Sequence, residues 1–192
     1  PFPSPSWPRP MFRKFDQSSV TGKSQVKSSV QRGIRNSIVE QYPNLEEEIE
    51  DLLPKKEPLF VVKCANHVSL VASGHNFVPL FFQVRDGPFV PTLRTLHQFP
   101  DLLPKYRVDR GAIRFVLSGA NIMAPGLTSA GGQMDDVDAN AVVGIFAEGK
   151  EHALAIGVTL SSTTDIRETN KGIAVENTHY LNDGLWHTLS VE

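Results

Sequence analysis

Apolar residues near the start of the chain recur at the spacing of one helix face. Residues 23–43 carry them at every fourth position, which predicts an amphipathic helix. A second helix is predicted over residues 44–53, because Asn44 with Glu47 three positions later is a capping-box variant and Pro54 ends the segment. The apolar stripe of the first helix consists of Val26, Val30, Ile34 and Ile38.

The apolar period changes beyond the second helix. Residues 58–64, 67–73 and 77–85 are short runs of β-branched and aromatic residues, and the turn-like SGHN between the last two predicts a hairpin. A short helix with proline in its first turn is predicted over residues 91–99. A proline-flanked connector follows, and we place a domain boundary near Pro104.

Another pattern occupies the second half of the chain. Asp109 is the expected N-cap of a helix, and Gly119 suits the left-handed residue that ends it. Pro125 and Gly126 are the residue types that a type II turn favours at its two central positions. Further strands are expected at 139–149, 152–162, 172–181 and 185–191, one helical turn at 163–170, and a polar loop at 130–139.

These elements predict an α+β protein in two parts. An N-terminal α/β domain is expected over residues 11–103, and a small β-barrel with an edge helix over residues 104–192. Residues 1–10 lack the apolar core of a secretory signal, so we expect an expression remnant or a disordered extension there. No apolar run is long enough to cross a bilayer, and the single cysteine fits a reducing compartment, so a cytoplasmic protein is expected.

Charge is unevenly distributed along a chain whose net charge is only -2. Six basic residues face one acid between residues 11 and 35, and five face two between residues 94 and 114. From residue 133 onward, three basic residues face ten acidic ones. The total therefore hides two basic surfaces, which suit either a polyanionic ligand or ordinary solvated faces.

Motifs for catalysis are missing from the sequence. It has no phosphate-binding loop, nucleophile elbow, zinc-protease helix or paired cysteines, and its six histidines are scattered. We therefore expect neither an enzyme nor a metal or other cofactor. Cys64 lies in an apolar run, which favours a buried structural thiol over a nucleophile.

The stretch SGANIMAPGLTS, residues 118–129, has no ionisable side chain, yet it follows a run that contains Arg107, Arg110 and Arg114. Glycine lets a backbone approach a nucleic acid closely, while arginines neutralise phosphates. The same glycines also suit a tight connection between a helix and a strand. The residues alone leave both interpretations open.

Longer motifs resemble known domains. VDRGAIRFVLSGANIMAPGLTS, FAEGKEHALAIGV and NKGIAVENTHYLNDGLWH are similar to a PUA domain, the RNA-binding module of pseudouridine synthases and archaeosine transglycosylases. MFRKF, GIRNSIVEQYP and RDGPFVPTLRTLHQFP resemble the N-terminal domain of the malignant T-cell-amplified sequence family. The resemblance covers residues 11–187, with the motifs in the family's order.

The resemblance implies a non-catalytic factor of the translation machinery. Such a factor binds RNA and the small ribosomal subunit together with a density-regulated protein as heterodimer partner. It acts in reinitiation after short upstream reading frames, in release of deacylated tRNA and in recycling of post-termination subunits. The alternatives are the RNA-binding subunit of a tRNA- or rRNA-modifying complex and a pure protein-interaction scaffold.

The resemblance also carries site residues onto this chain. The matching SGANIMAPGL motif implies RNA contacts along a helix-to-strand groove, and Arg107, Arg110 and Arg114 are added from charge and proximity. The basic face of the first helix is a second candidate, for ribosomal RNA. The motif residues are Gly119, Ala120, Asn121, Met123 and Gly126, and the helix residues are Lys27, Arg32 and Arg35.

Overall fold

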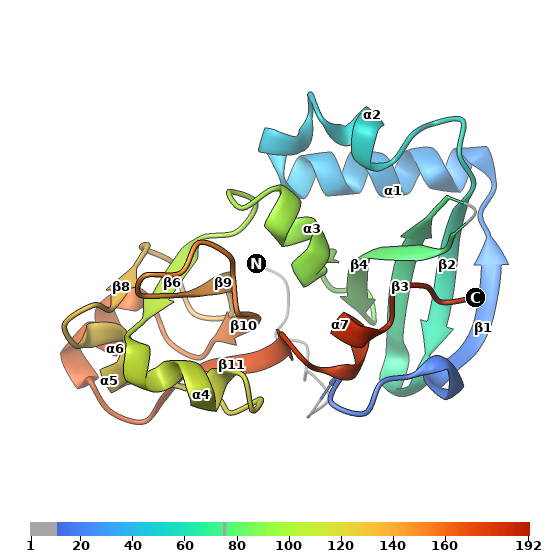
Figure 1. Ribbon diagram of the computed structural model, residues 1–192. Helices are drawn as coiled ribbons and strands as arrows, with labels where there is room; N and C mark the ends of the chain where they lie inside the picture. Colours follow the sequence, from blue (N-terminus) through green and yellow to red (C-terminus); the bar gives the residue numbers. More distant parts are fainter. Residues whose placement is uncertain (1–10, 75) are drawn as a thin grey trace.

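The computed structural model describes residues 11–74 and 76–192, which form two β-sheets with helices around each (Figure 1). The expected remnant or extension, residues 1–10, lies outside the described residues. The predicted α+β class is confirmed, because the chain completes one sheet at Pro91 and begins the second at Lys105.

The first sheet is antiparallel, with its five strands in sequence order. The three predicted apolar runs form its centre, because their alternate side chains pack into one core. The first strand was not predicted: residues 20–25 are mostly polar and exposed, and pairing with the second strand makes them extended. The strands are β1 (Val20–Gln25), β2 (Leu59–Cys64), β3 (Val68–Ser73), β4 (Val78–Val84) and β5 (Val90–Pro91).

The helices that accompany this sheet differ from prediction in their caps. Asn44 lies inside a 3-10 turn and caps no helix, and the α-helix that follows is a single turn. Pro91 belongs to the fifth strand, and Thr92 caps the next helix by accepting from the backbone N–H of Thr95. The helical elements are η1 (Gln17–Ser19), α1 (Ser28–Gln41), η2 (Pro43–Leu45), α2 (Ile49–Leu52), η3 (Ala65–His67) and α3 (Leu93–Gln98).

The buried face of α1 only partly matches the predicted apolar stripe. Ile38 is buried and Ile34 packs partly buried against the core, but Val30 is 49% exposed, and the polar residues Gln31 and Arg35 are buried. Gln31 Nε2 donates to two backbone carbonyls of the loop after α2, at 3.2 and 3.1 Å. Arg35 Nη2 lies 2.8 Å from a carboxylate oxygen of Glu50. The helix thus turns polar side chains inward because the loop beside it offers them partners.

The second sheet is mixed and has the order β7-β11-β10-β9-β6-β8. Its neighbours are antiparallel except β6 and β9, which are parallel. β6, whose first residues were interpreted as a connector in the sequence, becomes a strand through these two pairings and buries Tyr106 and Val108. The strands are β6 (Lys105–Val108), β7 (Ile122–Met123), β8 (Gln133–Met134), β9 (Val142–Ala147), β10 (Ala155–Thr159) and β11 (Ile173–Tyr180).

Two local predictions in this half are confirmed and two are wrong. Asp109 is the N-cap of η4, and Gly119 has a φ of 85°. Pro125 lies in the first turn of helix α5, so the type II turn is wrong, and the predicted strand at 185–191 contains a helix instead. The helical elements are η4 (Arg110–Ala112), α4 (Ile113–Val116), α5 (Ala124–Thr128), α6 (Thr163–Thr169) and α7 (Gly184–His187).

The last eleven residues leave the second sheet and pack on the first, where the C-terminus lies (Figure 1). Leu185 and Val191 are buried in the N-terminal core, and the backbone N–H of Val191 donates to the carbonyl of Phe77. Ile156 of β10 is buried in the same core. A core shared in this way holds the two sheets together as an obligate interface does.

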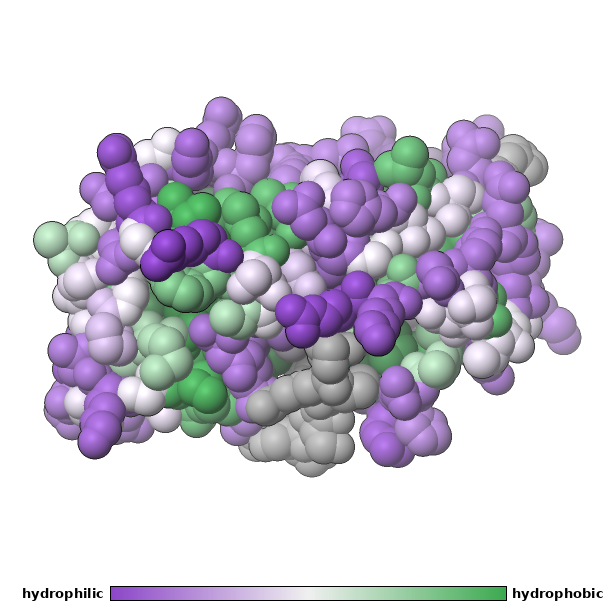
Figure 2. All heavy atoms as spheres, turned by 60° about the horizontal axis from the view of Figure 1, so that its bottom comes forward, coloured by the Kyte–Doolittle hydropathy of each residue, from purple (hydrophilic) through white to green (hydrophobic). Residues whose placement is uncertain are grey.

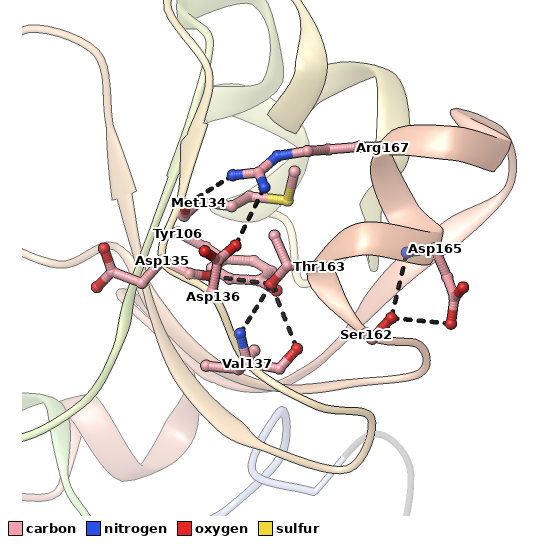
Figure 3. Close-up of polar contacts among 9 residues, drawn as sticks. All are labelled: Tyr106, Met134, Asp135, Asp136, Val137, Ser162, Thr163, Asp165 and Arg167. Atoms are coloured by element: carbon pink, nitrogen blue, oxygen red, sulfur yellow. Dashed lines mark hydrogen bonds and ion pairs between the residues drawn. The ribbon is translucent and has the colours of Figure 1, made fainter.

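The predicted polar loop is fixed to α6 by hydrogen bonds (Figure 3). The buried Thr163 hydroxyl lies 2.7 Å from the Tyr106 hydroxyl and 2.8 Å from the carbonyl of Asp135, and it accepts from the backbone N–H of Val137 at 3.0 Å. Arg167 pairs with Asp136 at 3.0 Å. The acidic residues of the loop are therefore held at the sheet edge, away from α4.

Candidate nucleic-acid interface

A groove follows η4 and α4 in the C-terminal domain. It begins at Asp109 and ends at Ala120 and Asn121, just beyond α4, and its volume is about 700 Å³. Figure 2 shows hydrophobic side chains gathered over this half of the molecule. We call it the α4–α5 groove. Its other wall residues are Gly111, Ala112, Phe115, Val116, Ile122, Met123, Pro125, Gly126, Ser129 and Ile173.

Asp109 fixes one end of the groove through local hydrogen bonds. Its carboxylate accepts from the backbone N–H of Ala112 at 3.0 Å and from the hydroxyl of Ser129 at 2.6 Å. Its own N–H donates to the carbonyl of Gly126 at 3.0 Å. The carboxylate that lines the groove is therefore satisfied by groups of the protein, and it joins η4 to α5.

Three large apolar side chains stand exposed around the groove. Phe115 is 52% exposed, Met123 49% and Ile173 43%. Apolar surface gathered at a concave site favours a ligand that covers it. Nucleobases suit such a surface because unstacked bases pack on aromatic and apolar side chains.

The three candidate arginines surround the helical segment and carry no carboxylate ion pair within the described residues. Arg107 Nε donates to the carbonyl of Gly131 at 2.9 Å. Arg110 lines a small hollow of about 250 Å³ together with Lys150 and Glu148. The Arg114 guanidinium lies 4.7 Å from the centre of the Phe115 ring, at the groove itself. All three side chains reach the surface and keep donors available for phosphates.

The glycine and asparagine of the loop are explained mainly by the fold. Gly119 adopts a positive φ, and a Cβ there would lie 2.7 Å from Cζ of Tyr180. Asn121 Oδ1 accepts from the backbone N–H of Asn177 at 3.1 Å. Gly119 is not a wall residue of the groove, whereas the predicted residues Ala120, Asn121, Met123 and Gly126 are.

The second basic candidate, on α1, is only partly at the surface. Lys27 and Arg32 are exposed, but the Arg35 side chain is 8% exposed and paired with Glu50. Arg35 is therefore not placed to contact ribosomal RNA, because a phosphate cannot reach its guanidinium. The sequence pattern missed this because it cannot show the acidic partner across the loop.

Other chemistry-bearing residues have structural roles. Across residues 11–74 and 76–192, no three His, Cys, Asp or Glu side chains gather as a metal site, and no helix has the length and apolarity to span a membrane. Burial raises the pKa of the Cys64 thiol to about 11, as expected for a structural cysteine. His179 Nδ1 lies 2.7 Å from Asp183 in the interior.

Among the wall residues of the groove that sequence reasoning missed are the exposed apolar residues Phe115 and Ile173. A signal for Phe115 was present, because Ile113, Val116 and Leu117 lie at helical spacing on one side of the segment and Phe115 is an apolar residue on another side. Ile173 gave no such signal, since apolar residues are ordinary in a strand.

Comparison with known proteins agrees with this architecture. The Pre-PUA-like domain family matches residues 15–100, and the PUA domain family matches residues 104–181. Malignant T-cell-amplified sequence 1-A of Xenopus laevis is 51% identical over 178 residues, which are 92% of this chain and 97% of that protein. The Drosophila melanogaster homolog is 51% identical over 183 residues, 95% of this chain and all of the homolog.

The chain belongs to the malignant T-cell-amplified sequence family. Malignant T-cell-amplified sequence 2 of Homo sapiens is another similar member, 50% identical over 178 residues, with 92% of this chain and 97% of that protein covered. The resemblance found in the sequence motifs is thereby confirmed, and the α4–α5 groove lies within the PUA domain of this family member.

Solved structures show the same fold. A hypothetical protein from the archaeon Pyrococcus horikoshii matches with a TM-score of 0.69 and 24% identity, over 88% of this chain and all of that one. A conserved PUA domain protein from Thermoplasma acidophilum matches with a TM-score of 0.62 and 20% identity, over 88% and 99% of the two chains. This chain and these archaeal proteins thus share the two-domain architecture.

Proposed function

We propose that this protein is a non-catalytic translation factor that binds single-stranded RNA in the α4–α5 groove. It acts in the cytoplasm on the small ribosomal subunit with a density-regulated-protein-type partner, in reinitiation, post-termination tRNA release and subunit recycling. Membership of the malignant T-cell-amplified sequence family supports the translation role. The observation that carries RNA binding is the open apolar groove with arginines beside it.

The groove suits unstacked bases better than a duplex. Its walls offer Phe115, Met123 and Ile173 as packing surfaces, and the carboxylate in its wall is already hydrogen-bonded. An A-form duplex presents phosphates and 2′-hydroxyls to a protein and keeps its bases stacked, so it gains little from such walls. Single-stranded loops and ends offer exposed base faces.

The protein acts by binding alone. Bases occupy the groove, while Arg107, Arg110 and Arg114 neutralise phosphates along the exposed side of η4 and α4. Occupying an RNA site on the subunit shifts the equilibrium between its bound states by the difference in affinity for each.

The test is RNA affinity as a function of salt. Fluorescence anisotropy with a labelled single-stranded oligoribonucleotide compares the wild type with a triple variant, Arg107→Ala, Arg110→Ala and Arg114→Ala. Each phosphate that the variant no longer neutralises removes about 0.7 from the log–log salt slope, so the slope of the triple variant is smaller by up to about 2. Lys56→Ala, on an exposed loop of the N-terminal domain, is the control. An unchanged slope in the triple variant refutes the arginine assignment.

The cellular role is tested by co-purification with and without nuclease. Recovery of small ribosomal subunits and a density-regulated-protein-type partner supports the proposal. Recovery of an RNA-modification complex favours the modifying-subunit alternative instead. Partner recovery that nuclease does not reduce, together with no affinity for RNA, favours a scaffold.

A further inference from the structure

A turn in the N-terminal domain has two positively charged side chains exposed to solvent. The backbone N–H of Phe15 donates to the carbonyl of Phe12 at 3.1 Å, which closes a turn with Arg13 and Lys14 at its centre. Phe12 and Phe15 are buried, whereas Arg13 and Lys14 are exposed. The MFRKF motif thus places two apolar anchors on either side of two exposed charges.

Both domains hold this 12–15 turn in place. The Phe12 ring lies 5.0 Å from the Phe82 ring of β4 and 5.6 Å from the His179 ring of β11. The backbone N–H of Gly184 donates to the Phe12 carbonyl at 2.8 Å, and a Cβ on Gly184 would overlap the Phe15 backbone. These contacts fix the position of the turn relative to the PUA domain.

Arg13 is hydrogen-bonded to the loop that leads from α4 to the wall residues Ala120 and Asn121. Its Nη2 donates to the carbonyl of Ser118 at 3.0 Å, two residues before Ala120 and three before Asn121. Arg13 has no carboxylate partner within the described part of the chain. One hydrogen bond to a carbonyl orients the guanidinium and leaves its other N–H groups for a phosphate.

We propose that Arg13 binds a phosphate of the RNA strand whose bases occupy the α4–α5 groove, so that the RNA-binding surface continues from the PUA domain onto the N-terminal domain. The inference rests on the proposed function of that groove. Arg114 and Arg13 then contact the same strand from the two domains, and Lys14 extends the positive surface beyond them. Strongly hydrophilic side chains lie between the two halves on this face (Figure 2).

The competing explanation is that Arg13 only caps the carbonyl end of α4. Cations at helix C-termini do satisfy free carbonyls. The two roles differ in what a change of charge does: a cap acts on stability, whereas a phosphate ligand acts on the salt dependence of RNA affinity. Gln at position 13 removes the charge, and its shorter side chain also loses the bond to Ser118, so Tm reports the capping role and the salt slope reports the phosphate role.

The experiment measures the salt slope of single-stranded RNA affinity and the Tm of the full chain for wild type, Arg13→Gln, Arg13→Lys and Arg114→Gln. Lys56→Gln is the matched control. We expect Arg13→Gln to lower the slope by about 0.7, Arg13→Lys to restore it, and Lys56→Gln to leave it unchanged. A labelled duplex serves as the comparison ligand, and the expected change is confined to the single strand.

The outcomes separate this inference from the proposed function. If Arg114→Gln lowers the slope and Arg13→Gln does not, RNA binds the PUA groove without Arg13 and only this inference is overturned. If Arg13→Gln and Arg13→Lys lower Tm equally and leave the slope intact, Arg13 is a cap. If wild-type protein binds no RNA, the proposed function itself fails.

Discussion

Substituting Gly119 and Gly126 separates the structural use of glycine in this loop from its use at a binding surface. Gly119 has a φ of 85°, and a Cβ there would lie 2.7 Å from Cζ of Tyr180, whose side chain is buried. Gly126 has no positive φ, and its added Cβ would meet Ala112 Cβ at an ordinary 3.5 Å. The two glycines therefore predict opposite effects of an added methyl group.

The magnitude for Gly119→Ala follows from two costs. A left-handed conformation costs a non-glycine residue about 1–2 kcal/mol, and crowding a packed interior costs about 1–3 kcal/mol. The free energy of unfolding should fall by about 2–5 kcal/mol, which lowers Tm by about 5–15 °C in a chain of this size. Gly126→Ala removes a glycine from helix α5 and should leave stability unchanged or raise it by up to about 1 kcal/mol.

Urea denaturation and RNA anisotropy of both variants supply the readout. Gly126→Ala, a wall residue of the groove, should weaken RNA affinity without loss of stability. Gly119→Ala should show the reverse at temperatures where it remains folded. The reasoning is refuted if Gly119→Ala keeps the wild-type urea midpoint while its RNA affinity falls, since the glycine would then serve the ligand and not the turn.

Two further predictions concern groups buried away from the groove. Arg35→Ala should lower the free energy of unfolding, measured in urea, by about 1–3 kcal/mol. Arg35→Met keeps the packed alkyl chain and should stay within about 1 kcal/mol of wild type. Equal losses in the two variants would contradict the packing argument. Cys64 should react slowly with a thiol reagent at pH 8 until urea is added, because burial raises the pKa of its thiol to about 11. The stability that comes from keeping this thiol protonated in the folded state is present below pH 9 and is lost as pH rises through 11. Rapid labelling of the native protein would show that the thiol is not buried in solution.

Local signals in the sequence located several elements correctly. Asp109 as an N-cap and Gly119 as a left-handed residue depend on hydrogen bonds and dihedral angles within a few residues, so the sequence contains what is needed to predict them. The central strands of the first sheet were equally clear, because short runs of β-branched and aromatic residues bounded by turn residues are typical of strands. Prediction failed at Pro125, where a proline begins a helix as readily as a turn.

Elements defined by distant partners were not predictable in this way. The strand at residues 20–25 is mostly polar, and pairing with β2 makes it a strand. The buried face of α1 contains Arg35 because Glu50 and the loop after α2 meet it there. The C-terminal residues 182–192 follow the PUA domain in sequence but pack on the other domain, since Leu185 and Val191 find their apolar partners there.

The candidate site likewise has features that local sequence reveals and features that only distant contacts decide. The family could be recognised from linear motifs, and the uncharged loop and its nearby arginines lie within about twenty-five consecutive residues, so the primary structure was enough to find them. Which of them face a ligand depends on the folded chain. Folding placed Gly119 against Tyr180, brought Ile173 from another strand to the groove and hydrogen-bonded Arg13 of the other domain to the loop after α4. A binding surface is assembled from side chains whose neighbours are fixed by packing, and packing partners far apart in the chain leave no local trace in its sequence.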